Sequence, residues 1–422
     1  IPDRTLVWRF VQDHVKKDLF FLATEFGIYT SINAGKNWQK LPGSPTISFR
    51  DIVIQEREND LVGASFGRGF FVLDDYSALR EMTPENLSKK GKLFKPRDAK
   101  LFKPRNSLGN TGGQFYTAKN PEYGAVFTYN LNDVPKTSKS LRMQRERKLN
   151  TDNKDVPFPG YDKLADEMNE KPASIILTIK DSEGNHIRNI KKNASNGSSR
   201  IAWNLRHKSY YPVRAGRGQS NFWFNPSGPY VTPGEYHAEI YLENNGSVEK
   251  LDGPIAFNVK PLRKGTLQGA SYNEYNSFRT RVSNLYVSMS KYQDEFNMMK
   301  SKIELLEKAS LQLETFSPEI MKKISEFKAK YNDFDSETGS NPARDEIGEW
   351  DKPTISMRVQ IAMQGLSTSY GPTDLNKSNL DIAERLFEKL ALDVKQFKSE
   401  LESLENEVKE LNPPHLSGTG IN

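Results

Sequence analysis

The chain has 422 residues, of which 36% are hydrophobic and 27% charged, so it is too polar for a membrane protein, while 11% aromatic residues are too many for a disordered one. Its net charge of +6 gives no basis for nucleic-acid binding at this length, and the absence of cysteine excludes disulfides, thiolate metal sites and cysteine nucleophiles. No stretch approaches the roughly 18 apolar residues of a membrane-spanning helix. We expect a soluble chain with about three folded domains.

Residues 1–80 contain two copies of one pattern. The run from Val11 to Phe20 reappears about 42 positions later as the run from Ile54 to Val62, and each copy has short β-branched and aromatic segments between polar or glycine turns. Blades of a β-propeller have this pattern and a length of about 40 to 45 residues. Because a propeller needs about four blades or more, we expect these to be the last two, with the other blades outside this chain.

A turn motif lies in the first copy. Ser31, Asn33, Gly35 and Trp38 match the S-x-D-x-G-x-x-W pattern of the Asp-box, with Asn33 in place of aspartate. We expect a structural role, in which a short side chain bonds the turn backbone, glycine takes a positive φ and tryptophan packs between strands.

These features resemble a known family. The Asp-box is typical of sialidase-like and sortilin-like propellers, and the segment from Asp51 to Asp75 looks like the closing blade of the large secreted BNR-repeat proteins of Bacteroidota. The chain therefore resembles the carboxy-terminal part of a BNR-repeat, sortilin-like propeller protein, a group in which many members are labelled glycosyl hydrolases. That resemblance implies export from a bacterial cell.

Residues 81–120 are rich in lysine, proline and glycine, and the run from Leu93 to Arg97 is repeated from Leu101 to Arg105. Proline cannot donate to a β-ladder, so we expect a strap between domains, with a basic docking motif as the alternative. Residues 121–262 return to a β pattern. Their order of strands and turns resembles the immunoglobulin-like, FlgD-type sandwich, with surface insertions at 133–171 and 207–230 and Trp203 in its core.

No acidic residue occurs between Gly184 and Gly234, whereas basic and aromatic residues alternate there. Three interpretations remain open for this segment: packing between domains, which we favour, binding of a protein partner, or binding of a glycan or other polyanion. The residues predicted to bind a partner or ligand are Tyr210, Tyr211, Arg214, Arg217 and Trp223.

Residues 263–412 are predicted to be helical. Apolar residues recur at alternating spacings of three and four from Val282 to Leu306 and again from Leu380 to Leu411. Two such seams predict an antiparallel helical hairpin within one bundle, with an intermolecular coiled coil as the alternative, and residues 413–422 form a tail.

The sequence predicts no catalytic residue, cofactor or metal site. The five histidines are scattered, and the acid we would examine first, Glu25, precedes a glycine turn. Charged residues of the second copy are expected to serve its turns: Arg50, Asp51, Arg57, Glu58, Arg68, Asp74 and Asp75.

The fold class we expect is multidomain, mainly β plus α, with two terminal propeller blades, an immunoglobulin-like sandwich and a helical hairpin bundle. We expect a non-catalytic interaction or scaffold module that is exported to the cell surface, the outer membrane or the periplasm. Its expected partners are other envelope proteins or the remaining blades, with a glycan as a further candidate. The alternative is a sialidase-like glycoside hydrolase whose active site lies mainly in blades outside this chain.

Overall fold

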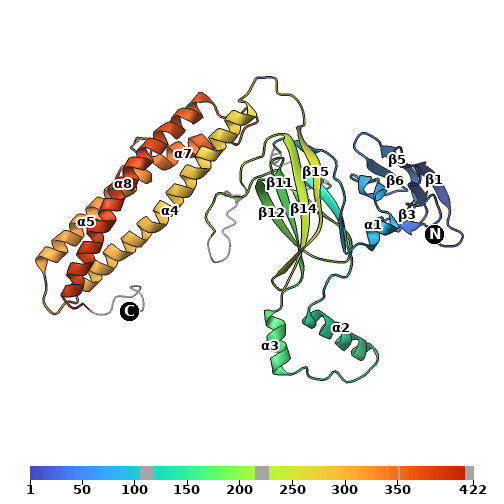
Figure 1. Cartoon of the computed structure of the whole chain (residues 1–422), viewed down its shortest axis with the longest axis horizontal. Helices are drawn as coiled ribbons and strands as arrows, with labels where there is room; N and C mark the ends of the chain where they lie inside the picture. The colour runs from blue at the N-terminus through green and yellow to red at the C-terminus, as the bar shows by residue number, and fades with distance from the viewer. Residues whose placement is uncertain (105–117, 119, 214–227, 340, 350–351, 414–422) are drawn as a thin grey trace. The chain divides into compact units, whose positions relative to one another are not determined.

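The computed structural model describes residues 1–104, 118, 120–213, 228–339, 341–349 and 352–413. The fold is mixed β and α, with several antiparallel sheets, and the chain divides into two compact units (Figure 1). Unit 1 comprises Ile1–His207 and Pro233–Leu262, and unit 2 comprises Lys208–Thr232 and Arg263–Asn422. The insertion expected at 207–230 thus belongs almost entirely to the unit that contains the long helices.

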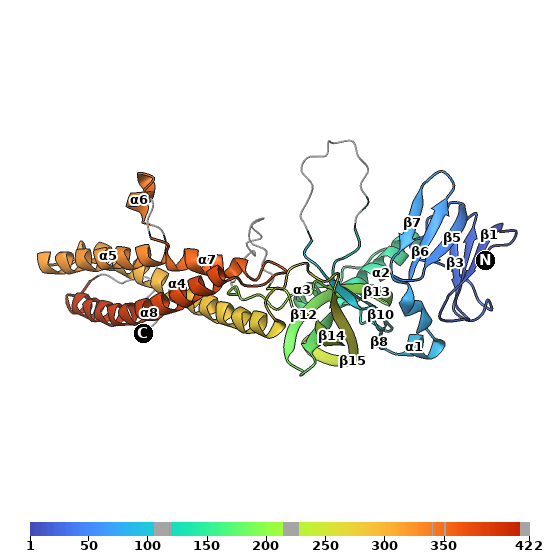
Figure 2. The same cartoon turned by 90° about the horizontal axis from the view of Figure 1, so that it is seen from above.

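Two antiparallel sheets begin unit 1, and we call them the amino-terminal sheets (Figure 2). The first has the order β1-β2-β3-β4 and the second β5-β6-β7. Their strands are β1 (Val7–Gln12), β2 (Phe20–Thr24), β3 (Gly27–Ser31), β4 (Gln39–Lys40), β5 (Phe49–Gln55), β6 (Asp60–Ser65) and β7 (Phe70–Leu73).

A shared core joins the amino-terminal sheets. Phe21 and Ile28 of the first sheet and Phe49 and Leu61 of the second are all buried in one apolar cluster. Gly63 on β6 is required by this packing, because a Cβ atom there would lie 2.9 Å from the side chains of both Ile28 and Phe49.

The rest of unit 1 is a two-sheet sandwich. One sheet has the order β13-β10-β8 and the other β12-β11-β14-β15-β9. Phe127 packs edge-on against Phe257 across the two sheets at 5.1 Å between ring centroids, and Trp203 is fully buried beside them, as predicted. The strands are β8 (Gly91–Leu93), β9 (Ala99–Leu101), β10 (Ala125–Leu131), β11 (Ser174–Asp181), β12 (His186–Asn193), β13 (Gly197–Trp203), β14 (Gly234–Asn244) and β15 (Ser247–Pro261).

The prediction of a strap without ladders at 81–120 is wrong for its first part. A 3-10 helix η1 (Ser77–Arg80) and helix α1 (Pro84–Ser88) precede β8, which pairs antiparallel with β10, and β9 pairs in parallel with β15. Both strands avoid the prolines, because Pro96 lies between them and Pro104 follows β9. Residues 105–117 and 119 lie outside the described residues.

The insertion at 133–171 carries two helices, α2 (Ser138–Thr151) and α3 (Tyr161–Asn169), and we call these residues the arm. Neither helix has a buried residue, and Figure 1 shows both helices beyond the end of the sandwich strands. The expected surface position of this insertion is confirmed.

Unit 2 is built on two long helices with shorter ones between them. They are α4 (Tyr272–Ser310), α5 (Pro318–Thr338), α6 (Pro342–Glu346), α7 (Ile355–Gln364) and α8 (Asp374–Glu410). The predicted seams form the core of this unit, where Phe296, Ile303, Leu390 and Phe397 are buried in one cluster.

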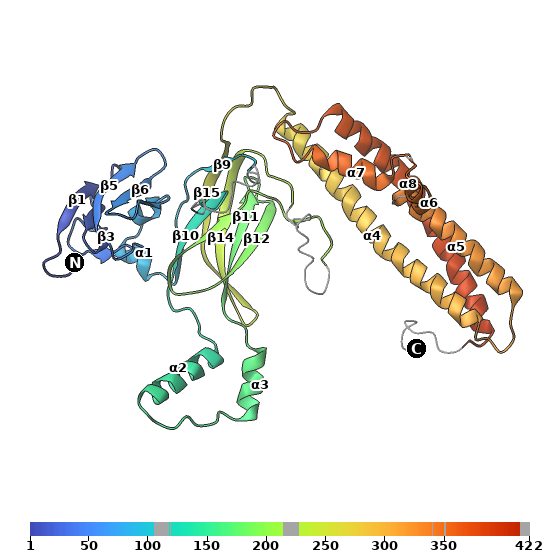
Figure 3. The same cartoon turned by 180° about the vertical axis from the view of Figure 1, so that it is seen from behind.

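The predicted antiparallel hairpin is wrong, because α4 and α8 run in the same direction (Figure 3). Four ion pairs join these helices, each between residues 103 positions apart: Glu274–Lys377, Arg281–Glu384, Glu295–Lys398 and Lys302–Glu405. A constant offset requires parallel helices. Helix α5 runs the opposite way, since Lys323 pairs with Glu407 and Lys330 with Glu400. The long connection between the seams therefore contains a return pass of α5 and α7.

Candidate interaction surfaces

The charged residues of sheet β5–β7 separate into two groups at its opposite ends. Arg50 and Asp51 lie where β5 begins, and Arg68 lies in the turn between β6 and β7 at the same end. The hairpin with Glu58, and Asp74 after β7, lie at the other end. These residues cannot converge on one active site, because they lie at opposite ends of the sheet.

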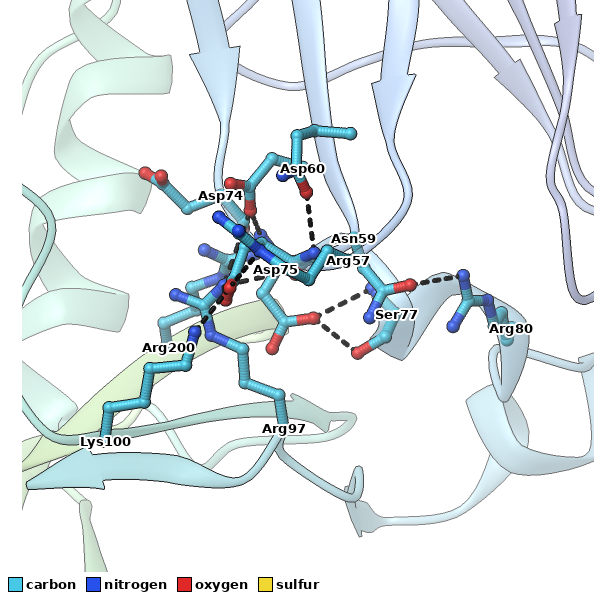
Figure 4. A network of polar contacts seen from close by, with 12 residues as sticks. Arg57, Asn59, Asp60, Asp74, Asp75, Ser77, Arg80, Arg97, Lys100 and Arg200 are labelled. Carbon is cyan, nitrogen blue, oxygen red and sulfur yellow. Dashed lines mark hydrogen bonds and ion pairs between the residues drawn. The ribbon is translucent and has the colours of Figure 1, made fainter. Parts of the chain in front are cut away.

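One end is fixed to the sandwich by a polar network (Figure 4). Glu58 accepts a hydrogen bond from Lys100 of β9, and this bond, together with the charge of Arg97, lowers the pKa of Glu58. The Arg200 guanidinium of β13 donates to the main-chain oxygens of Asp74 and Asp75, at 2.7 and 2.8 Å. Through these contacts, residues of this end join the second amino-terminal sheet to the sandwich.

Burial raises the pKa of the Asp74 carboxyl group, and the nearby charge of Asp60 raises it further. A raised carboxyl pKa can mark a general acid, but here the neighbouring groups already have structural roles. Asp75 accepts hydrogen bonds from the hydroxyl and main-chain N–H of Ser77, and Asp60 accepts one from the main-chain N–H of Asp75 (Figure 4). The network therefore stabilises the start of η1.

The opposite end carries aromatic side chains and arginines, and we call it the aromatic–arginine end: Trp8, Arg50, Phe66, Arg68 and Phe70. The guanidinium carbon of Arg50 lies 3.7 Å from the ring centroid of Trp8 and 5.0 Å from that of Phe66. Phe66 is 70% exposed and Phe70 77%. Aromatic residues and arginine are enriched in protein interfaces relative to the rest of the surface.

An apolar face continues from this end across sheet β5–β7. Val53, Val62 and Val72 are opposite one another in register on the three strands, and Ala64 is opposite Phe70 in the next row. Val53 and Val72 are each about half exposed. The face is therefore an apolar surface without a covering layer in this chain's described residues.

The carboxylates near this end are engaged locally. Glu25 accepts a hydrogen bond of 3.0 Å from the main-chain N–H of Leu6, and Asp51 forms an exposed ion pair of 3.4 Å with Arg9. Neither forms a pair of acids with the other in the described contacts, and no group of three or more His, Asp or Glu side chains in the described residues could hold a metal ion.

The four residues of the predicted Asp-box lie in one turn. Asn33 Oδ1 accepts hydrogen bonds from the Ser31 hydroxyl at 3.0 Å and from the main-chain N–H of Asn37 at 2.9 Å, while the Gly35 N–H donates to Ser31 Oγ. Gly35 has a φ of +83°, and the half-buried Trp38 ring lies against Phe20. An asparagine oxygen thus accepts the hydrogen bonds of this turn where the motif has an aspartate oxygen.

The structure describes only some of the predicted binding residues in the segment between Gly184 and Gly234, which contains no acidic residue. Tyr210 and Tyr211 stack on each other, and both rings contact Tyr286 of α4 edge-on, at 5.1 and 5.0 Å between centroids. Arg214, Arg217 and Trp223 lie outside the described residues. The two tyrosines therefore contact a helix of their own unit.

Sequence reasoning missed two polar clusters. Asp13 is buried beside Arg80, and Glu239 of β14 is buried among Lys180, Lys250 and Tyr241. Although burial opposes ionisation of Glu239, the hydrogen bonds from these three side chains lower its pKa to about 2. The ion pairs of Asp13 with Arg80 and of Glu239 with Lys180 have no local signal, because the partners lie 67 and 59 positions apart in the sequence.

No family model matches the chain, and no curated protein matches it. A solved structure does match, that of an extracellular domain from B. thetaiotaomicron described as belonging to a one-component system. The two are 12% identical, the match covers 62% of this chain and 26% of that chain, and the TM-score is 0.15. This chain thus spans about a quarter of that chain, and so weak a likeness establishes no shared fold. Among the described residues, no helix is both long and apolar enough to cross a bilayer.

Proposed function

We propose that this chain is a non-catalytic interaction and scaffold module of an exported bacterial protein that acts at the cell surface, at the outer membrane or in the periplasm. The aromatic–arginine end carries this proposal. Trp8, Phe66 and Phe70 expose large rings, and the Arg50 guanidinium contacts two of them, which restricts its position before a partner arrives. Partner binding would bury these rings, which is the source of affinity in most interfaces.

We also propose that the amino-terminal sheets are two blades of a BNR-repeat, sortilin-like propeller, and that the sandwich is immunoglobulin-like. The hydrogen bonds of Ser31 and Asn33 support the first part, as does the packing of two sheets with sequential strand order face to face. The uncovered face at Val53, Val62 and Val72 has the chemistry of a further blade contact. Further blades and other envelope proteins are therefore the partners proposed for this surface.

The non-catalytic part of the proposal rests on how the carboxylates are used. Glu58 binds Lys100 and Arg97, Asp51 binds Arg9, and Glu25 accepts a main-chain hydrogen bond. A glycoside hydrolase needs two carboxyl groups free to act on opposite sides of one glycosidic bond, about 5 to 10 Å apart. These three acids instead have structural partners.

Site-specific photocrosslinking tests the interaction surface. A photoreactive residue at position 66 should yield crosslinks in envelope fractions of the source organism, whereas the same residue at Glu85 on the exposed side of α1 should not. The crosslink should weaken when Arg50 is replaced by alanine. Equal crosslinking at both positions would reject this surface.

An activity measurement tests the non-catalytic part. The longest natural form of the protein should show no hydrolysis of sialosides or other glycosides that depends on residues of this chain. Hydrolysis that is lost in both Glu25→Gln and Asp51→Asn would overturn the proposal in favour of an enzyme.

A further inference from the structure

The arm at 133–171 is poorly packed for two helices. Helices of 14 and 9 residues are marginal by themselves in water, and most helices in proteins are stabilised by burying an apolar face. The most buried side chains of the two helices are only half-buried, and they are Arg142, Glu146, Leu149, Leu164 and Glu167. Arg142 donates hydrogen bonds of 2.8 to 3.1 Å to Glu167 and one of 2.8 Å to Glu146. The contact between the helices is therefore mainly an ion pair.

Both helices leave apolar side chains in solvent. On α3, Tyr161, Ala165 and Met168 recur at the spacing of one helix face, and Tyr161 is 82% and Met168 87% exposed. Phe158 packs edge-on against Tyr161 at 5.0 Å and extends this face. Leu141 and Met143 on α2 are exposed as well. This much apolar surface on a small projecting element is typical of an interface.

The two helices carry opposite charge. Helix α2 has five basic residues and one acidic residue: Lys139, Arg142, Arg145, Arg147, Lys148 and Glu146. Helix α3 has Asp162, Asp166 and Glu167 against Lys163. Arg145, Arg147, Asp162 and Asp166 are exposed, and none of these four has an ion-pair partner among the described residues.

We propose that the arm is a dimerisation element whose occupant is the arm of a second copy of this chain, with α3 of each copy packed against α2 of the other. A twofold axis makes this contact twice, so the acidic α3 meets the basic α2 on both sides and the interface is self-complementary. The exposed Tyr161 and Met168 of α3 and Leu141 of α2 are buried at its centre. This inference goes beyond the proposed function, because it concerns another surface and another occupant.

The base of the arm is suited to hold this position. The main-chain N–H of Ser138 donates to Glu170 at 2.6 Å, and the N–H of Val134 donates to Asn196 of the sandwich at 2.8 Å. The two ends of the arm are therefore tied to each other and to the sandwich. A dimer formed at the arm would leave the aromatic–arginine end available for other partners.

Charge reversal in the whole chain tests the proposal by analytical ultracentrifugation. The natural chain should dimerise in the micromolar range, as expected for a small interface. Arg145→Glu with Arg147→Glu changes the net charge of α2 from +4 to 0, and Asp162→Lys with Asp166→Lys changes that of α3 from −2 to +2, so that both helices are basic. Each double variant alone should have a dimer dissociation constant raised at least about tenfold, because the first loses the charge attraction in both contacts and the second brings like charges together in both.

Mixing these two variants is the decisive measurement. The mixture should form a heterodimer that is tighter than the dimer of either variant and weaker than that of the natural chain, because the acidic α3 of the first variant meets the basic α2 of the second in one of the two contacts. Recovery in the mixture also shows that both variants are folded. Lys389→Glu with Lys395→Glu, on exposed positions of α8, changes the net charge equally and should leave dimerisation unchanged.

Two results would overturn the proposal. One is a natural chain that remains monomeric at every concentration measured. The other is a mixture of the two double variants that stays monomeric while circular dichroism shows the helical content of the natural chain in both. A dimer that persists in both double variants would place the interface elsewhere and would overturn it equally.

Discussion

Arg80 and Asp13 lie 67 positions apart in the chain, and the Arg80 guanidinium donates two hydrogen bonds of 2.8 Å to the Asp13 carboxylate. The Tyr76 hydroxyl and the main-chain N–H of Lys16 donate two more, each at 2.6 Å. Although burial opposes the charge of Asp13, these donors hold its pKa well below the usual range. The pair joins the β1–β2 hairpin to the segment that follows β7, so it links the beginning and the end of the amino-terminal sheets.

Replacing Asp13 by asparagine should destabilise the amino-terminal sheets. The loss should be about 3 to 5 kcal/mol at pH 7, because the substitution leaves a largely buried guanidinium without its counter-ion. A carboxylate with a depressed pKa stabilises the fold fully above its unfolded pKa of about 4, and this contribution is lost as the pH falls from there through the folded pKa. The natural chain should therefore lose stability as the pH falls below about 4, and Asp13→Asn should lose less.

Urea unfolding followed by tryptophan fluorescence at several pH values measures this effect, since Trp8 and Trp38 lie in these sheets. Asp51→Asn is the matched control. Its carboxylate is paired with Arg9, but both side chains are more than half exposed, and the cost should stay below about 1 kcal/mol. Equal losses in the two variants would contradict the role assigned to Asp13.

The Asn33 side chain should act in its turn as a hydrogen-bond acceptor. Asn33→Ala removes the acceptor for Ser31 and Asn37 and should cost about 1 kcal/mol, whereas Asn33→Asp retains an oxygen there and should change stability by less than about 0.5 kcal/mol. Thermal unfolding of both variants gives the comparison. A larger cost for aspartate than for alanine would show that the amide group is needed for another reason.

Phe397 should be a major stabilising residue of unit 2. Its side chain is 1% exposed and packs against Phe327 and Phe334 at 5.3 and 5.5 Å between centroids. Phe397→Ala should therefore cost about 3 to 5 kcal/mol in chemical unfolding followed by helical circular dichroism. Leu392 on the same helix is 70% exposed, so Leu392→Ala should cost less than about 1 kcal/mol. A Phe397 effect as small as this control would place the seam outside the core.

Tyr286 should hold the segment from 208 to 213 against α4. The rings of Tyr210 and Tyr211 both contact it, and aromatic pairs contribute about 0.5 to 1.5 kcal/mol beyond the area they bury. Tyr286→Ala should accelerate amide hydrogen exchange in this segment about tenfold or more, and Tyr286→Phe should have a much smaller effect because it keeps the ring. Unchanged exchange in Tyr286→Ala would reject this contact.

The sequence allowed the apolar seams and the central core residues to be predicted, since periodicity reports which face of an element is buried. Phe296, Leu390 and Phe397 are in the core of unit 2, and Trp203 is in the core of the sandwich. Periodicity does not report direction, because a heptad seam packs equally well against a parallel or an antiparallel partner. The charge pattern carried that information, in the constant offset of pairs such as Arg281–Glu384.

The candidate surfaces were harder to predict for a different reason. Phe70 and Phe71 are adjacent and both aromatic, so composition alone suggests that this strand is buried on both sides. Only the register shows that Phe71 points into the core and Phe70 to the uncovered face. Asp13 and Arg80 were missed because the distance in sequence between them gives no local signal.

Because α4 and α8 are parallel, the start of α4 and the end of α8 lie at different ends of the helical bundle. A hairpin makes two passes and returns the chain to its point of entry. Three passes carry it to the far side, so the beginning of α4 and the end of α8 are separated by nearly a full helix length, about 58 Å for 39 residues at 1.5 Å each. The three passes of unit 2 therefore hold the start of α4 and the end of α8 at opposite ends of one helical bundle.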